Sequence, residues 1–220
     1  MYSRTKMAET AILDKVAVLF NKWLLQGIDK EMEREHNYAV MVMLSKLKTS
    51  DPFDFLDVGC GNGWTVRKVA KDPSCKSAWG IDVSDEMIKR AKILQNSTKQ
   101  YFLQTDLLTW RPRKKFDVVL SMEALYYIGI EPAIRKIYDL LKPRGQFLCG
   151  VDYYLENKAS HSWAEICNVS MDLRSRKEWV DIFKTTGFKN VRQENILYPE
   201  AISAEKWKQQ FGTLFTQGIK

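Results

Sequence analysis

The sequence predicts an α/β fold in which helices flank a mostly parallel sheet. Past residue 50, short β-rich apolar runs alternate with longer amphipathic stretches, the pattern of strand–helix units on a parallel sheet. The run 116–122 is almost continuously apolar, as strands covered on both faces are. A glycine-rich turn at 59–63 separates the first such run from the amphipathic segment that follows it. These features predict a seven-stranded sheet.

The individual elements follow from these runs. We expect strands at 53–58, 77–83, 101–104, 116–122, 146–151, 188–197 and 209–217. We expect helices at 64–71, after a cap at Ser84, at 132–141 and at 178–185. Pro132 suits a first helical turn, and Gly187 suits a helix end. Residues 142–145, which read KPRG, are expected to form the turn into the fifth strand.

The first 50 residues have a different pattern. Segments 8–25 and 30–47 both carry helical periodicity, and Gly27 lies between them. We therefore expect residues 1–50 to form a helical cap or lid, packed on a single domain that spans residues 51–220.

The composition limits where the protein works and what it binds. No apolar run approaches the roughly 20 residues of a membrane span, and the N-terminus has no secretory signal pattern, so we expect a soluble, cytoplasmic protein. The four cysteines lack zinc-site spacing and are expected to be reduced. The formal charge of +7 would suit nucleic acid, but the basic residues are scattered, which makes that partner unlikely. Neither a metal site nor an oligomeric state is indicated.

The strongest motif is FLDVGCGNG, residues 55–63, at the end of the first expected strand. Glycine allows a tight turn and a close approach to a ligand. Asp82 ends the second strand about 20 residues on, where an acid can accept both ribose hydroxyls. The glycines are spaced GxGxG, whereas dinucleotide sites use GxGxxG. Asp57 suits a cationic amino group and would repel a diphosphate, so a cofactor with an amino acid tail fits best.

From residue 53 onward the chain resembles the class I S-adenosylmethionine-dependent methyltransferases, which implies a Rossmann-like sheet. The resemblance implies a cofactor site made of Asp57, Gly59, Cys60, Gly61 and Gly63 around the methionine moiety, Asp82 at the ribose, Val83 and Met87 as adenine walls, Asp106 with Leu107 at the adenine amino group, and Ser121 and Met122 beneath the cofactor. Trp23 is a further candidate that could lie over the cofactor or belong simply to the core.

A closer resemblance is to small-molecule methyltransferases that share the stretches MExxH, SMEALYY and GVDxYxENxASHxW. It implies that His36 lies at the mouth of the cofactor pocket and His161 in the acceptor region. Histidine is the commonest general base, although a lone histidine more often makes one structural hydrogen bond. Glu123 and Tyr126 are rival catalytic candidates, with loop packing as the alternative role.

We therefore expect an enzyme that transfers the methyl group of S-adenosylmethionine to a small-molecule acceptor by in-line displacement. Segment 121–129 lacks the NPPY-like sequence of methyltransferases that act on base or amide nitrogens, which argues against DNA. The alternatives are an RNA or protein methyltransferase, prompted by the +7 charge, and a non-catalytic cofactor-binding module of the same fold. An NAD-dependent oxidoreductase is disfavoured by the glycine spacing.

Overall fold

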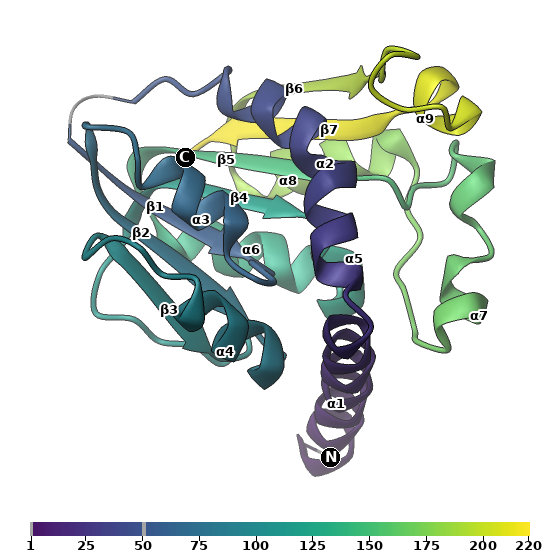
Figure 1. Cartoon of the computed structure of the whole chain (residues 1–220), viewed down its shortest axis with the longest axis horizontal. Coiled ribbons are helices and arrows are strands. Elements are labelled where there is room, and N and C mark those ends of the chain that lie inside the picture. Colours follow the sequence, from purple (N-terminus) through teal and green to yellow (C-terminus); the bar gives the residue numbers. More distant parts are fainter. Residues whose placement is uncertain (1, 50–51) are drawn as a thin grey trace.

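Helices and strands alternate along most of the chain. In the computed structural model, which describes residues 2–49 and 52–220 and gives only the backbone for 2–12, these elements are drawn in Figure 1. In chain order they are α1 (Tyr2–Leu25), α2 (Ile28–Leu44), β1 (Phe53–Val58), α3 (Trp64–Val69), β2 (Cys75–Asp82), α4 (Asp85–Ile93), β3 (Gln100–Gln104), β4 (Phe116–Met122), α5 (Leu125–Ile128), α6 (Ile130–Leu140), β5 (Leu141–Val151), a 3₁₀ turn (Lys158–Ser160), α7 (Trp163–Cys167), α8 (Arg176–Thr186), β6 (Lys189–Ile196), α9 (Lys206–Gln210) and β7 (Thr213–Ile219).

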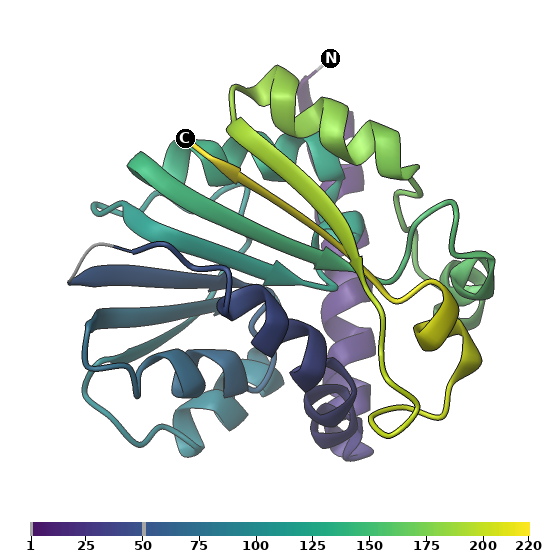
Figure 2. The ribbon, with the colours of Figure 1, turned by 90° about the horizontal axis from the view of Figure 1, so that it is seen from above.

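Within the described residues, seven strands form one sheet in the order β3-β2-β1-β4-β5-β7-β6. All neighbours pair in parallel except β7, which runs antiparallel to β5 and β6. Seen from above, α2, α3 and α4 lie on one side of the fanned strands and α6 and α8 on the other (Figure 2). The predicted mostly parallel, Rossmann-like sheet is confirmed. Parallel strands end at the same edge, so loops far apart in sequence meet there.

The central strands are buried on both faces, as their continuous apolar runs predicted. Every residue of β1 is buried. Successive residues point to opposite faces, so Phe55 packs with α2 and α3 while Leu56 packs with α6 and α8. The same alternation in β4 and β5 gives two apolar layers, one on each side of the sheet, and these layers fix the strand ends in place.

The last predicted strand was partly wrong. Residues 206–210 form α9, and β7 begins only at Thr213. Gly212 makes the turn between them with φ of 62°, and a Cβ there would lie 2.2 Å from the carbonyl oxygen of Ile196. The short helices α5 and α7 were also not predicted. The KPRG residues lie within β5, where the pairing with β4 shifts between Leu141 and Gln146.

The two N-terminal helices cross the edge where the parallel strands end (Figures 1 and 2). Gly27 separates them with φ of 74°. Asn21 of α1 receives a hydrogen bond from the Ser84 hydroxyl at 2.6 Å and donates one to Asp85 at 2.9 Å, which ties α1 to the start of α4. Among residues 2–49 and 52–220, no helix is both long and apolar enough to cross a membrane.

A buried ion cluster closes the opposite edge of the sheet. Asp54, 6% exposed, accepts hydrogen bonds from Lys114 at 2.9 Å, Lys142 at 3.0 Å and Ser77 at 2.7 Å. Burial acts to raise the pKa of Asp54, but these three donors outweigh it and lower the pKa to about 2. Lys114, in the loop before β4, also donates to Ser77 at 2.8 Å and therefore links β1 to β2.

We predict that Asp54→Asn lowers the free energy of unfolding at pH 7 by about 1 to 3 kcal/mol, because a fall in pKa from 3.8 to about 2 is worth roughly that much. The pKa is lower in the folded chain, so this stability is present above pH 4 and is lost as the pH falls toward 2. Urea unfolding of both proteins at several pH values measures it. A difference between the two that stays constant from pH 7 to pH 3 would contradict the prediction.

Candidate functional site

A cleft of about 940 Å³, counting its open mouth, lies where β1, β2 and β4 end. The strand ends and the turns after them line one side, and α1 and α2 line the other. Its walls are mainly apolar, with a few polar groups that converge, as is usual for small-molecule sites. The residues of α1 and α2 in its lining are Leu13, Val16, Phe20, Asp29, Met32 and His36.

The glycine turn after β1 forms the floor of the cleft. Gly59, Gly61 and Gly63 all have positive φ, between 52° and 78°. A Cβ on Gly59 would lie 2.3 Å from Ala124, and one on Gly63 would lie 2.4 Å from Phe102. A Cβ on Gly61 would meet nothing within 4 Å among the described residues. Gly59 and Gly63 therefore allow close packing of their neighbours, and Gly61, which lines the cleft, leaves open space beside it.

Asp82 both borders the cleft and holds the turn in shape. One carboxylate oxygen accepts the backbone N–H of Gly61 at 2.9 Å, and the other accepts that of Ser84 at 2.9 Å. Burial raises the pKa of Asp82, although these backbone donors act against it. The residue expected at the ribose thus also has a structural role, which the spacing alone does not reveal.

Asp57 lies in the cleft at an electrostatic cost. Its side chain is buried, and among the described residues it has no hydrogen-bond or ion-pair partner. Burial, and then the charge of Asp82, raises the pKa of Asp57 to about 8. A buried carboxyl group without a counter-charge is suited to bind a ligand that carries a positive charge.

Two polar residues of the cleft were missed from the sequence. Asn62, 3% exposed, donates from its amide to Asp29 at 3.1 Å. The other carboxylate oxygen of Asp29 is buried and has no partner within the described chain. Asn62 lies in the glycine motif and could have been found there, whereas Asp29 on α2 gives no local signal. Orphaned buried oxygens usually mark an absent ligand or an ordered water.

The chemistry of the cleft fits S-adenosylmethionine. Asp29 and Asp57 offer carboxyl oxygens to a cationic amino group, and Gly61 leaves the space for a close approach. Nine of the expected cofactor residues line it: Asp57, Gly59, Cys60, Gly61, Asp82, Val83, Met87, Leu107 and Met122. The structure therefore brings together residues from four separate strand–turn segments, as the resemblance implied.

Four other expected cofactor residues do not line the cleft. Asp106 faces an adjoining hollow and accepts the N–H of Leu108 at 2.9 Å. Ser121 is buried and donates to the carbonyl of Val58 at 3.0 Å. Gly63 caps α3. Trp23 packs edge-to-face on Phe20, with ring centroids 5.2 Å apart.

Of the four catalytic candidates, two line the cleft and two do not. His36 and Glu123 line the cleft. Tyr126 lies behind Glu123 and donates its hydroxyl hydrogen to that carboxylate at 2.8 Å. His161 is exposed, and its Nε2 lies 2.8 Å from the carbonyl oxygen of Leu155. The structure does not bring His161 to the cleft.

Glu123 is held by an unusual backbone conformation. Its φ is 57°, which is uncommon for a residue other than glycine and often marks a functional turn. Its carboxylate accepts the Tyr126 hydroxyl and the backbone N–H of Asp152. Burial, and then the charge of Asp152, raises the pKa of Glu123. Burial raises the pKa of Asp152 as well, to about 6.

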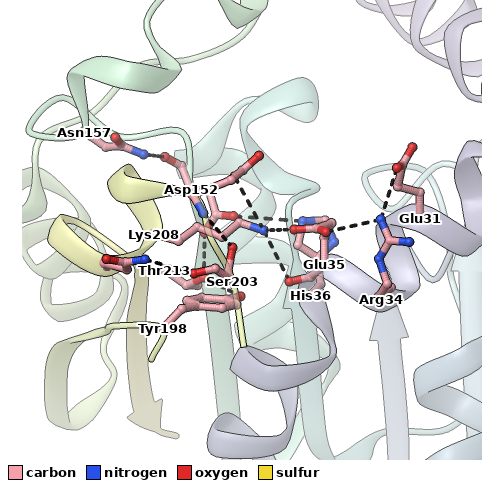
Figure 3. A network of polar contacts seen from close by, with 12 residues as sticks. Glu31, Arg34, Glu35, His36, Asp152, Asn157, Tyr198, Ser203, Lys208 and Thr213 are labelled. Atoms are coloured by element: carbon pink, nitrogen blue, oxygen red, sulfur yellow. Dashed lines mark hydrogen bonds and ion pairs between the residues drawn. The ribbon is translucent and has the colours of Figure 1, made fainter. Parts of the chain in front are cut away.

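The sequence did not reveal Asp152 or Lys208, which complete this end of the cleft (Figure 3). The Asp152 carboxylate lies 4.0 Å from Nε2 of His36 and accepts the Thr213 hydroxyl at 2.6 Å. Lys208, 3% exposed, pairs with Glu35 of α2. Burial, and then the charge of Lys208, lowers the pKa of His36 to about 4, so that the imidazole is neutral at pH 7.

Comparison with known proteins places this site in a family. The model of a methyltransferase domain matches residues 21–193. Phosphoethanolamine N-methyltransferase 2 of Caenorhabditis elegans is 30% identical over 74% of this chain, and thiocyanate methyltransferase 1 of Arabidopsis thaliana is 26% identical over 70%. The chain spans 40% and 65% of the lengths of these two relatives.

A solved structure has a similar fold over most of the length of this chain. In a complex of the Haloferax volcanii Trm112 methyltransferase activator with a protein described as a methyltransferase, the matching chain superposes with a TM-score of 0.83 at 28% identity. The match covers 91% of this chain and 96% of that one. The matched family, the sheet order and the glycine turn beside Asp57 and Asp82 agree, and the chain belongs to the class I S-adenosylmethionine-dependent methyltransferases.

Proposed function

We propose that the protein transfers the methyl group of S-adenosylmethionine to a small-molecule acceptor. The observation that supports this most is the cleft itself, whose lining combines unpaired acids beside the glycine turn with His36 and Glu123. When bound, the cofactor supplies a sulfonium whose methyl carbon is electrophilic. The task left to the chain is to position the acceptor, which can contribute about 7 to 11 kcal/mol.

We assign the cofactor contacts from the lining of the cleft. Asp57 and Asp29 hold the amino group of the methionine moiety, because each has a carboxyl oxygen without a partner. Asp82 accepts the ribose hydroxyls while keeping its hold on Gly61. Val83, Met87 and Leu107 supply apolar contacts for the adenine.

The relatives support a small acceptor. Their names concern phosphoethanolamine, thiocyanate and the sterol cycloartenol, which differ in size and charge but are all small molecules. The apolar walls contributed by α1 and α2 also suit an enclosed acceptor better than a polymer that must lie across an open surface. Filter binding to total RNA across a salt series would reveal the alternative RNA substrate through tight, salt-sensitive binding.

A pair of glycine variants tests the cofactor site. At both Gly61 and Gly27 an added methyl group would meet no atom within 4 Å. Gly61 lines the cleft, whereas Gly27 lies in the turn between α1 and α2 and does not. Both residues have positive φ, so both variants carry a similar strain of roughly 1 to 2 kcal/mol. We expect Gly61→Ala to weaken binding of S-adenosylhomocysteine by roughly tenfold or more, about 1.4 kcal/mol or above, and Gly27→Ala, whose residue does not line the cleft, to weaken it less.

Calorimetry with S-adenosylhomocysteine, S-adenosylmethionine and NAD measures this. NAD should not bind, because the glycines are spaced GxGxG and not GxGxxG as in dinucleotide sites. Tight binding of NAD without binding of S-adenosylmethionine would refute the assignment, and equal affinities for the two variants would remove the glycine turn from the site.

We further propose that α1 and α2 act as a cap that closes over the bound cofactor, as residues 1–50 were expected to do. Leu13, Val16 and Phe20 of α1 face the cleft, and Asn21 is the main polar tie of α1 to α4. Caps of this kind tighten only after the ligand binds. Adding S-adenosylhomocysteine should therefore slow hydrogen exchange in α1 and α2 and hardly change it in β1 and β4. Unchanged exchange in both helices at saturating ligand would make them fixed scaffold.

A further inference from the structure

The end of the cleft where His36 and Glu123 lie holds three groups that could share one ligand. His36, Glu123 and Asp152 each offer one ligand atom, and these three atoms lie within 4.8 Å of one another. They come from α2, from the turn after β4 and from the end of β5, so the fold assembles them from distant parts of the chain. His36 and Glu123 border the cleft, and Asp152 stands next to them.

Two of these groups have hydrogen-bonding capacity that the described residues do not use. The Asp152 side chain is 2% exposed, and one of its oxygens accepts from Thr213. Its other oxygen has no hydrogen-bond partner among those residues and points at Nε2 of His36 across 4.0 Å (Figure 3). Neither nitrogen of His36 has a partner there. A carboxylate oxygen of a nearly buried side chain that has no hydrogen-bond partner is free to accept from a ligand.

The 4.0 Å separation distinguishes between possible ligands. A nitrogen donor about 2.9 Å from both atoms would subtend an angle of about 90° between them, which suits two of its N–H groups. A transition metal about 2.1 Å from both atoms would need an angle of about 145°, far from tetrahedral or octahedral geometry. Both oxygens of Glu123 already accept hydrogen bonds as well. The geometry favours a nitrogen donor over a metal ion.

The surrounding charges leave room for a positive head group. The cation nearest to the cluster, Lys208, is matched by Glu35, and Glu205 lies 4.0 Å from its ammonium. Glu123 and Asp152 therefore keep an excess of negative charge around the gap. Tyr126 and Tyr198 also face this end, as neutral phenols, because burial raises the pKa of both.

We propose that Asp152 and His36, backed by Glu123, bind the amino group of a small amine acceptor. This inference rests on the proposed methyl transfer and names its substrate class. An amine arrives as its ammonium form. One N–H bond breaks, the proton forms an O–H bond with a carboxylate of the Glu123–Asp152 pair, and the electron pair stays on nitrogen. Neutral His36 accepts a remaining N–H hydrogen bond, and Phe20, Met32 and Tyr127 contact the apolar body.

The two histidines of the chain allow a direct test. Protein labelled with ¹⁵N at histidine and saturated with S-adenosylhomocysteine is titrated with methylammonium chloride, and both rings are followed by NMR. Sodium chloride at equal ionic strength and methanol are the matched controls. We expect methylammonium alone to shift the His36 ring signals in a saturable way and to leave His161, which is exposed and bonded to Leu155, unchanged.

Variants locate the effect. Asp152→Asn should weaken the methylammonium response by roughly tenfold or more, since a hydrogen bond to a charged group is lost. Asp181→Asn, which changes an exposed acid on α8 that pairs with Lys177, should not change it. Glu123→Gln replaces Asp152→Asn if the latter fails to fold.

The outcomes separate this inference from the proposed function. If S-adenosylhomocysteine binds and methylammonium shifts His36 no more than sodium does, the amine subsite is wrong and the methyltransferase proposal stands. If one equivalent of Zn²⁺ saturates the His36 shift and methylammonium has no effect, the cluster is a metal site and the proposal is overturned. If S-adenosylhomocysteine itself does not bind, the proposed function fails first.

Discussion

Three carboxyl groups line the cleft, the buried Asp29 and Asp57 and the partly exposed Asp82, and no described side chain forms an ion pair with any of them. Burial without a counter-charge is costly, as the pKa of Asp57, raised to about 8, records. The unfolded chain loses the Asp57 proton near pH 4, so the contribution of Asp57 to the free energy of unfolding of the ligand-free protein falls as the pH rises from about 4 to 8. The ligand-free fold therefore bears the free-energy cost of burying an acid without a counter-charge, and a cationic ligand removes this cost.

Much of the remaining structure keeps these groups in place. The two apolar layers fix the ends of β1, β2 and β4, the backbone N–H groups of Gly61 and Ser84 hold Asp82, and the amide of Asn62 holds Asp29. At the opposite edge, where no ligand is needed, Asp54 is fully paired with two lysines. The paired acid, Asp54, stabilises the scaffold, whereas the acids without a counter-charge mark the site.

The sequence predicted those parts of the fold and site that local patterns encode. Apolar runs marked the strands, and Asp57, the glycine turn and Asp82 could be found because each lies at or directly after the end of a strand. Asp29, Asp152 and Lys208 could not be predicted, since their roles depend on α2, β5 and α9 meeting in space. The strand expected at 209–217 was partly wrong, because the turn at Gly212 and the burial of Lys208 against Glu35 are tertiary effects that override local β propensity.

We propose that the unpaired acids bind the cationic amino acid tail of S-adenosylmethionine. Asp57 holds a proton at pH 7 in the ligand-free protein, and an amino group that is itself protonated at that pH favours the ionised carboxylate. Calorimetry of S-adenosylmethionine binding in two buffers with different enthalpies of ionisation measures the proton exchange. The account predicts that wild-type protein releases protons to the buffer at pH 7, that the release fades above pH 8, and that Asp57→Asn abolishes it. Binding whose measured enthalpy is the same in both buffers for the wild-type protein would contradict it.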